Sequence, residues 1–262
     1  MKPICLASSS QGNCYILEFM VNGMPTRIMV ECGIPKATIY QRLSKEGIDI
    51  TTIQACLITH SHGDHSSAAR DMERIDIPIF ASQETLTAIG VDGTPMKRLT
   101  PTKICDGIFA MAFDVEHDCP GSVGFVIKTK DECVIFVNDH KRWTYDLRKF
   151  KPDYVFIECN YFHKVVYAQI SELRRKIKNS PLSKEEYQEC KMKIAQHERN
   201  LNSHCSLHGT ICGLNKLNLV NCKAIFLMHL SDRYANEYKM KNEVQFEKQI
   251  LTLVCQKNGG IK

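Results

Sequence analysis

Short runs of apolar and β-branched residues recur along the chain, and each has the length of a single β-strand. Gly, Pro, Asn, Asp or charged residues bound these runs. The runs are CYILEF (14–19), TRIMVEC (26–32), IQACLIT (53–59), IPIFAS (77–82), MAFDVEH (111–117), GFVIKT (124–129), CVIFVN (133–138), YVFIEC (154–159) and KAIFLMH (223–229). They predict a protein rich in strands.

Helix-like segments separate some of these strands. They are SSAARDMERI (66–75), SQETLTAI (82–89) and NEVQFEKQILTLVCQK (242–257). Ser66 or Asp64 is expected to cap the first helix, because either side chain offers an oxygen to free backbone N–H groups. The mixture predicts an α/β fold in which helices cover two sheets, giving four layers.

One segment, about 164–200, departs from this pattern and has a strongly helical composition. Ser180-Pro181 interrupts it, and the SKEE sequence (183–186) has the form of a capping box. We predict a helical hairpin inserted into the main domain, packed loosely or against a second copy in a homodimer. The basic run at 174–178 indicates a solvated helix face more than a nucleic-acid contact.

Length and composition indicate one large globular domain, 1–262, with 44% hydrophobic and 24% charged residues. No window approaches the roughly 18 uninterrupted apolar residues of a membrane span, and MKPICLASSS lacks the features of a signal peptide. We therefore expect a cytoplasmic protein with no membrane partner. The net charge of +5 is compatible with a phosphate-bearing substrate but does not identify one.

The thirteen cysteines are scattered, mostly inside apolar runs, and none forms a CxxC pair. This distribution indicates reduced, buried thiols instead of a disulfide framework or a four-cysteine zinc site.

The segment LITHSHGDHSSA (57–68) places three histidines and an aspartate directly after an apolar run. Beyond a strand end, His60 and His62 project to the same side and can share one metal ion. Asp64 and His65, carried onward by the turn at Gly63, can reach a second ion. Imidazole and carboxylate ligands suit zinc, manganese or iron, so this HxHxDH pattern predicts a metal site.

THSHGDH resembles the signature of the metallo-β-lactamase fold superfamily, whose fold is a four-layer αβ/βα sandwich. The resemblance implies three further ligands at later strand ends: His117 in VEHDC, Asp139 in VNDH and His229 in LMHLSD. It further implies two divalent metal ions, zinc or manganese. One ion would be held by His60, His62, His117 and Asp139, and the other by Asp64, His65, Asp139 and His229.

Other segments resemble the WalJ (YycJ) branch of this superfamily, described as DNA 5′-exonucleases. They are LASSSQGNCYIL (6–17), FIECNYF (156–162), NSHCSL (202–207) and HLSDRYAN (229–236). The chain departs from the family at Glu31, where an Asp-Cys-Gly sequence is usual, and at the inserted hairpin. The longer Glu31 side chain is expected to affect metal retention.

Several residues are candidates for contact with substrate. The loop containing Ser9, Ser10 and Asn13 could offer backbone amides to phosphate, or could be a plain hairpin turn. Asn160 follows a strand and could contact substrate or orient ligand-supporting groups. His140 is expected at the rim of the site.

His204 lies where phosphodiesterase relatives carry a histidine that contacts phosphate or protonates the leaving oxygen. A rival interpretation places His204, His208 and Cys212 on one helix face as a separate zinc site, completed by Cys190 or His197. The two glycines of HGTICGLNK make that stretch a poor helix, which argues against the rival.

The function implied by the resemblance is metal-dependent hydrolysis of a phosphodiester by a water activated between two metals, with Asp64, Asp139 and His204 as catalytic residues. The expected partner is a nucleic acid or nucleotide substrate. The main alternative is a cyclic-nucleotide phosphodiesterase of the same fold. Thioester or lactam hydrolysis, and a non-catalytic binding module on a decayed hydrolase, fit the sequence less well.

Overall fold

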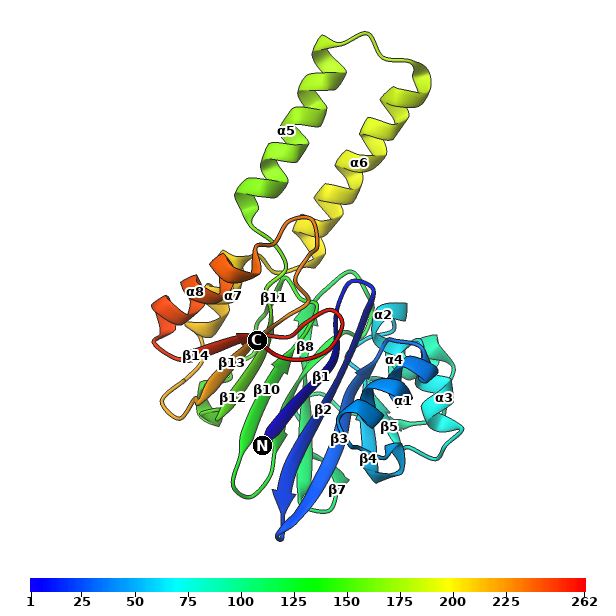
Figure 1. Ribbon diagram of the computed structural model, residues 1–262, viewed down its shortest axis with the longest axis vertical. Helices are drawn as coiled ribbons and strands as arrows, with labels where there is room; N and C mark the ends of the chain where they lie inside the picture. The colour runs from blue at the N-terminus through cyan, green and yellow to red at the C-terminus, as the bar shows by residue number, and fades with distance from the viewer.

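Two β-sheets lie face to face, with helices on both outer faces and a helical hairpin extending from one end (Figure 1). The computed structural model describes residues 1–262. The first sheet has the order β1 (Lys2–Ser9), β2 (Gly12–Val21), β3 (Met24–Cys32), β4 (Ile53–Leu57), β5 (Ile79–Ala81) and β6 (Thr94–Pro95). Strands β1 to β3 are antiparallel, and β3 to β6 pair in parallel.

The second sheet has eight strands. Its order is β11 (Arg142–Trp143), β8 (Ile108–Glu116), β9 (Val123–Lys128), β10 (Cys133–Val137), β12 (Tyr154–Glu158), β13 (Ala224–Met228) and β14 (Leu251–Val254), with β7 (Thr102–Cys105) paired to β8. The strands from β10 to β14 pair in parallel, so the C-terminal ends of β10, β12 and β13 meet at one edge.

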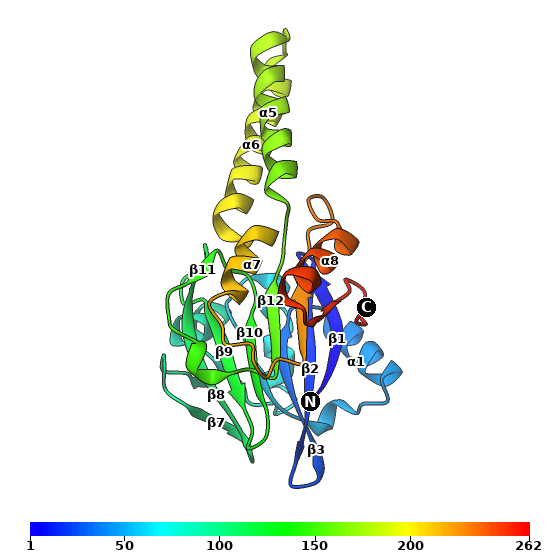
Figure 2. The ribbon, with the colours of Figure 1, turned by 90° about the vertical axis from the view of Figure 1, so that its left-hand side faces the viewer.

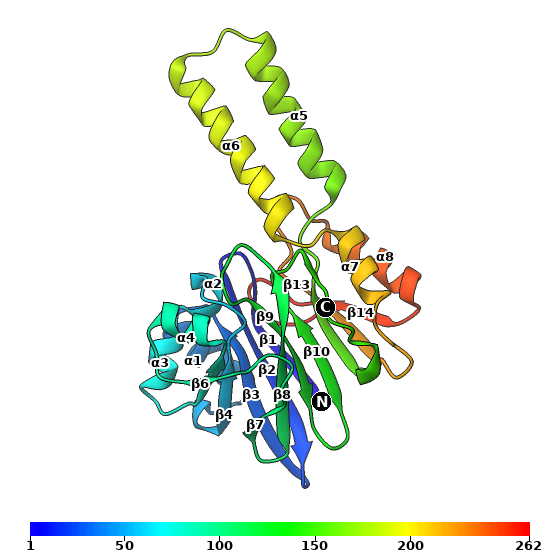
Figure 3. The ribbon, with the colours of Figure 1, turned by 180° about the vertical axis from the view of Figure 1, so that it is seen from behind.

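Helices cover the outer face of each sheet. The first sheet is covered by α1 (Lys36–Lys45), α2 (Gly63–Ser66), α3 (Ala69–Glu73) and α4 (Gln83–Ile89), and the second by α7 (Leu207–Leu214) and α8 (Glu237–Lys248). Two 3-10 turns occur in connections, Ile50–Thr52 and Arg148–Phe150. Figure 3, seen from behind, shows the two helical layers on opposite sides of the sheets. The predicted four-layer α/β arrangement is therefore confirmed.

Alternation of side chains along the strands produces this layering. On β2, Tyr15, Leu17 and Phe19 enter the core between the two sheets. Cys14 and Ile16, on the opposite face of the same strand, pack among the residues under the helices. Because both faces of the central strands are buried, each apolar side chain contributes roughly 1.5–3 kcal/mol by leaving water.

The inserted hairpin consists of α5 (His163–Asn179) and α6 (Lys184–Ser203), and it extends well beyond the sandwich (Figure 2). Helix α5 ends before Ser180-Pro181, and the Ser183 and Glu186 side chains form the predicted capping box. A small apolar cluster that includes Tyr161, Val166 and Ile170 anchors its base.

Four local predictions are wrong. In place of one helix at 66–75, the chain forms two short helices, α2 and α3, because the Ala68 N–H donates to the Cys32 carbonyl and the chain turns there. Neither Ser66 nor Asp64 caps a helix; the Ser66 hydroxyl bonds back to the Ser61 and His62 carbonyls.

The C-terminal segment also differs from the prediction, since α8 ends at Lys248 and the following residues form β14. Gln249 adopts a left-handed conformation with φ of 54°, and Thr252 and Val254 are then buried in alternation against β13. The stretch HGTICGLNK (208–216), expected to be a poor helix, lies largely in α7, because Ser206 caps the N-terminus of this helix and buried Leu207 and Leu214 pack it on the second sheet.

All thirteen cysteines are free, and most are buried, as their distribution predicts. None of the helices has both the length and the apolar character required to span a membrane.

Candidate metal centre

The histidines and aspartates of the predicted centre all follow strand ends. His60, His62, Asp64 and His65 lie in the loop after β4 and in α2, whereas His117 follows β8. Asp139 and His229 follow the parallel strands β10 and β13. The structure brings these seven side chains together in two adjacent clusters.

The first cluster consists of His60, His62 and His117. His62 Nδ1 lies 3.1 Å from His60 Nε2 and 3.3 Å from His117 Nε2. Burial, and for His62 also the charge of His117, lowers the pKa of His60 and His62. These imidazoles are therefore neutral near pH 7, which is the form that binds a metal.

The second cluster consists of Asp64, His65, Asp139 and His229. Asp139 Oδ2 lies 3.4 Å from His65 Nε2 and 3.9 Å from His117 Nε2, so this carboxylate lies between the two clusters. Its Oδ1 is buried without a hydrogen-bond partner, 3.3 Å from His229 Nδ1. A cation bound between these groups would satisfy that oxygen, so the donor set fits divalent metal binding.

Within the second cluster, the carboxylates and imidazoles shift one another's pKa values. Burial disfavours charge on Asp139, but the neighbouring His229 and His65 outweigh it and hold the pKa of the carboxyl well below its ordinary value. Burial alone would lower the pKa of His229, whereas Asp139 and the hydrogen bond to Asp64 raise it to about 10. The pKa of His65 is raised in the same way, by Asp139 and Glu31 against burial.

A ring of buried polar side chains fixes the orientation of the ligands. Glu31 Oε1 lies 3.2 Å from His65 Nδ1, and Glu31 also accepts hydrogen bonds from the N–H and hydroxyl of Thr59. The longer side chain at this position therefore reaches its ligand histidine. On the other side, the Asn160 amide donates to the His229 carbonyl and lies 3.1 Å from His229 Nδ1.

Two residues of the centre have strained backbone. Glu31 and His229 have φ values of 62° and 54°, which are uncommon for residues other than glycine. The surrounding hydrogen bonds, including one from the His229 N–H to the Ser8 hydroxyl at 2.9 Å, maintain these conformations. Such strain is often found at functional sites, where it aims a side chain.

His204 lies beside the second cluster, at the end of α6. Its Nδ1 is 2.6 Å from Glu158 Oε1 and 3.6 Å from Asp139 Oδ2. Burial would lower the pKa of His204, but the Glu158 and Asp139 carboxylates raise it. The side chain is 18% exposed and lines the cleft above the clusters, so it can present a proton to a bound molecule.

The cleft over the clusters has a volume of about 390 Å³ and no hydrophobic lining residues. One wall comes from the base of the hairpin, whose position just ahead of His204 predicts an effect on substrate access. The wall residues that sequence reasoning missed are Gln196, Arg199, Asn200 and Ser203. The only feature of the sequence that could have pointed to these residues is the position of the insertion just before His204.

Of the residues predicted to contact substrate in the N-terminal loop and at Asn160, one lines the cleft and three are buried. Ser10 lines the cleft, whereas Ser9, Asn13 and Asn160 are at most 2% exposed. The Asn13 amide donates to the Ser9 and Asp64 carbonyls, and Ser9 Oγ accepts from the Gln11 N–H in a tight turn. Because these groups are turned inward, Ser9, Asn13 and Asn160 support the loops and do not reach the cleft.

Two further expectations differ from the structure. His140 is buried, not at the rim; its N–H donates to Glu158 and its ring packs near Trp143. The rival zinc site does not form, because His204 precedes α7 and faces Glu158, leaving only His208 and Cys212 adjacent, 3.5 Å apart.

Comparison with known proteins supports the fold. Residues 8–103 match the family model of the metallo-beta-lactamase superfamily, a span that includes the HxHxDH loop but ends before His117. No match was found among curated protein sequences.

Two solved structures resemble the chain over its whole length. One is the metallo-beta-lactamase fold protein YhfI from Bacillus subtilis, with 11% identity, a TM-score of 0.67, and coverage of 100% of this chain and 99% of that one. The other is Zn²⁺-bound PqqB from Methylobacterium extorquens, with 11% identity, a TM-score of 0.65 and the same coverage. The chain therefore has the metallo-β-lactamase fold.

Proposed function

We propose that this protein is a metal-dependent hydrolase that cleaves phosphodiesters and acts on DNA from the 5′ end. The observation that carries the proposal is the arrangement of two ligand clusters on either side of Asp139, beneath a cleft with an entirely polar lining. The zinc in PqqB supports a divalent metal in this fold. The WalJ-like segments support the choice of substrate.

In this proposal, His60, His62, His117 and Asp139 would hold one divalent ion, and Asp64, His65, Asp139 and His229 would hold a second. Two such ions would supply a water nucleophile at neutral pH and would stabilise charge on the phosphoryl oxygens. Glu31 and Asn160 orient the ligands, as the contacts to His65 and His229 indicate.

His204 has a separate task in the proposal. The Glu158 carboxylate fixes its Nδ1 and favours the protonated ring. From the cleft wall, His204 can then donate a proton to the leaving oxygen of the substrate. Arg199 and Ser10, which also line the cleft, are available to bind the phosphate.

Product analysis tests this function. Manganese- or zinc-loaded protein is incubated with 5′-phosphorylated linear DNA and, separately, with cyclic nucleotides. We expect mononucleotides released from the 5′ end by the wild type and by Asp146→Ala, an exposed aspartate in an ion pair with Arg148. Asp139→Ala should release none while remaining folded.

Other outcomes would contradict the proposal. If the protein left the DNA intact but hydrolysed cyclic nucleotides, it would be a cyclic-nucleotide phosphodiesterase and not a nuclease. If metal-loaded protein hydrolysed neither substrate, the proposal that it cleaves phosphodiesters would be wrong.

A further inference from the structure

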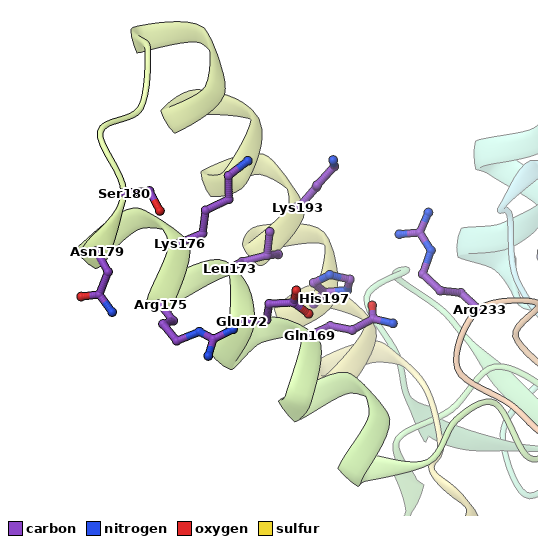
Figure 4. A pocket seen from close by; sticks show the side chains of 10 residues that line it. All are labelled: Gln169, Glu172, Leu173, Arg175, Lys176, Asn179, Ser180, Lys193, His197 and Arg233. Carbon is purple, nitrogen blue, oxygen red and sulfur yellow. The ribbon is translucent and has the colours of Figure 1, made fainter.

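A large groove lies between the two helices of the hairpin (Figure 4), and none of its lining residues belongs to the metal clusters. It has a volume of about 820 Å³, and Leu173 is the single hydrophobic residue among the ten that line it. Helices α5 and α6 supply most of the lining, and Arg233 extends toward the hairpin from the loop after β13. We call this feature the hairpin groove.

The hairpin groove is positively charged. Four cationic side chains line it, Arg175, Lys176, Lys193 and Arg233, against a single carboxylate from Glu172. Lys193 forms an ion pair with Glu189, which does not line the groove, whereas the three other cations have no ion-pair partner. Unpaired cations around a polar cavity create a potential that attracts an anion.

A buried histidine adds a directional group to the groove. His197 is 3% exposed, and its Nδ1 is hydrogen-bonded to the Tyr234 hydroxyl at 2.5 Å. Its Nε2 has no hydrogen-bond partner in the protein, and the ring lines the groove. Because His197 lines the groove and Nε2 makes no hydrogen bond within the protein, this nitrogen is available to a bound ligand.

A polar stripe on α6 leads from the groove to the metal cleft. Lys193, Gln196, His197 and Asn200 have spacings of three and four residues, so they share one helix face. Lys193 and His197 line the groove, while Gln196 and Asn200 line the cleft. At about 1.5 Å per residue, the stripe from Lys193 to Asn200 spans about 10 Å.

We propose that the hairpin groove binds the sugar–phosphate backbone of a single-stranded nucleic acid whose end lies in the metal cleft. This inference rests on the proposed function, because it assumes that the cleft receives a phosphodiester. Four cations with one apolar lining residue suit backbone phosphates better than stacked bases, so binding is expected to be independent of sequence. On this proposal, Arg175 and Lys176 of the basic run, which was expected to be a solvated helix face, contact the nucleic acid.

Binding of the metal-loaded, full-length protein to a fluorescent phosphorothioate oligothymidylate, measured by anisotropy over a range of salt concentrations, tests the groove. The variant Arg175→Gln/Lys176→Gln removes two groove cations. Its matched control, Lys178→Gln/Lys191→Gln, removes two charges from the same hairpin outside the groove. We expect the groove variant to bind on the order of tenfold more weakly, with a salt slope lower by about 1.4, whereas the control stays near the wild type.

Hydrolysis of bis(p-nitrophenyl) phosphate, which is too small to reach the groove, separates this inference from the proposed function. We expect the groove variant to keep wild-type activity on this diester. If both double variants lost oligonucleotide binding equally, overall charge would explain the loss, and the proposal that the hairpin groove binds nucleic acid would be wrong. No binding by the wild type, or binding of polyglutamate in place of DNA, would also overturn it. Groove-dependent binding without diester hydrolysis would refute the proposed function alone.

Discussion

The Arg199 guanidinium donates a hydrogen bond to the Asp118 carboxylate at 2.6 Å, and this contact joins the hairpin to the loop that carries His117. The other carboxylate oxygen of Asp118 lies 3.2 Å from His117 Nε2. Burial raises the pKa of Asp118, but Arg199 and His117 outweigh it and lower the pKa below its ordinary value. The hairpin therefore contributes charge to the edge of the first ligand cluster.

Replacing Arg199 with Gln should impair catalysis more than folding. An exposed ion pair contributes only about 0–1 kcal/mol to stability, whereas loss of the cation leaves the Asp118 charge facing an anionic substrate. We expect kcat/KM for a phosphodiester to fall on the order of tenfold. Arg174→Gln, which breaks the Arg174–Glu198 pair elsewhere on the hairpin, is the control and should keep its activity on a small diester. Equal activities in the two variants would contradict a role for Arg199 in the cleft.

The affinity for a metal ion should depend on pH differently at the two clusters. His60 and His62 have lowered pKa values and are neutral at pH 7, whereas the pKa of His229 is raised to about 10. A cation in the second cluster must therefore displace protons, so its affinity should rise steadily with pH between about 6.5 and 10. We expect one tightly held equivalent near pH 6 and a second at higher pH, measured by elemental analysis after dialysis.

Stability of the metal-free protein should change in the opposite direction over the same range. The pKa of His229 is higher in the folded protein than the value of about 6.5 for a free histidine. Its contribution to the free energy of unfolding is therefore complete below pH 6.5 or so and is lost as the pH rises toward about 10. Denaturant unfolding with chelator should show this decline, and His229→Gln should reduce it. In the metal-binding experiment of the preceding prediction, an affinity for the second metal ion that did not change with pH would show that the ion does not displace protons.

The ligands were predictable from sequence to different extents. His60, His62, Asp64 and His65 stand within six positions after an apolar run, so their convergence is a local property of the chain. His117, Asp139 and His229 are distant in sequence, and only resemblance to a known pattern connected them. Their meeting depends on the strand order of the second sheet, which hydrophobic alternation does not specify.

The direction of small polar side chains could not be predicted. Ser9, Ser10 and Asn13 look alike in sequence, yet a tight turn buries Ser9 and Asn13 and leaves Ser10 at the cleft. The cleft wall on α6 was also missed, because helical composition predicts the hairpin but not which face of it meets the site. At the C-terminus, the apolar run after Lys248 fits a helix locally, and pairing with β13 makes it a strand.

Glu31 should control metal retention at the second cluster. Its carboxylate lies 3.2 Å from His65 Nδ1, and groups in this position typically change metal affinity by about 10–100-fold. We therefore expect Glu31→Gln, which keeps the size but removes the charge, to weaken binding of the second equivalent within that range. Competition with a chromophoric chelator measures it. Glu18→Gln, which alters a pair with Arg27 outside the centre, should leave affinity unchanged. An unaltered affinity in Glu31→Gln would show that the carboxylate charge is not needed.

Gly33 should tolerate no side chain, because the loop carrying the ligands passes directly over it. A Cβ at this position would lie 1.7 Å from the Asp64 carbonyl oxygen and 2.4 Å from the backbone nitrogen of His65. The Gly33 N–H donates to the Asn13 carbonyl at 2.8 Å, so Gly33 cannot retreat without breaking that contact. Gly33→Ala must therefore displace Asp64 and His65, at a cost of about 3 kcal/mol or more in unfolding free energy and with loss of metal from the second cluster.

Gly63→Ala is the matched control, because a Cβ there meets nothing within 4 Å although it lies in the same loop. Its unfolding free energy should stay within about 0.5 kcal/mol of the wild type. Denaturant unfolding and metal content, measured on both variants, separate a steric effect at Gly33 from any sensitivity of the loop to an added methyl group. If both variants retained wild-type stability and metal, the close packing of β3 against the ligand loop would not be what positions Asp64 and His65.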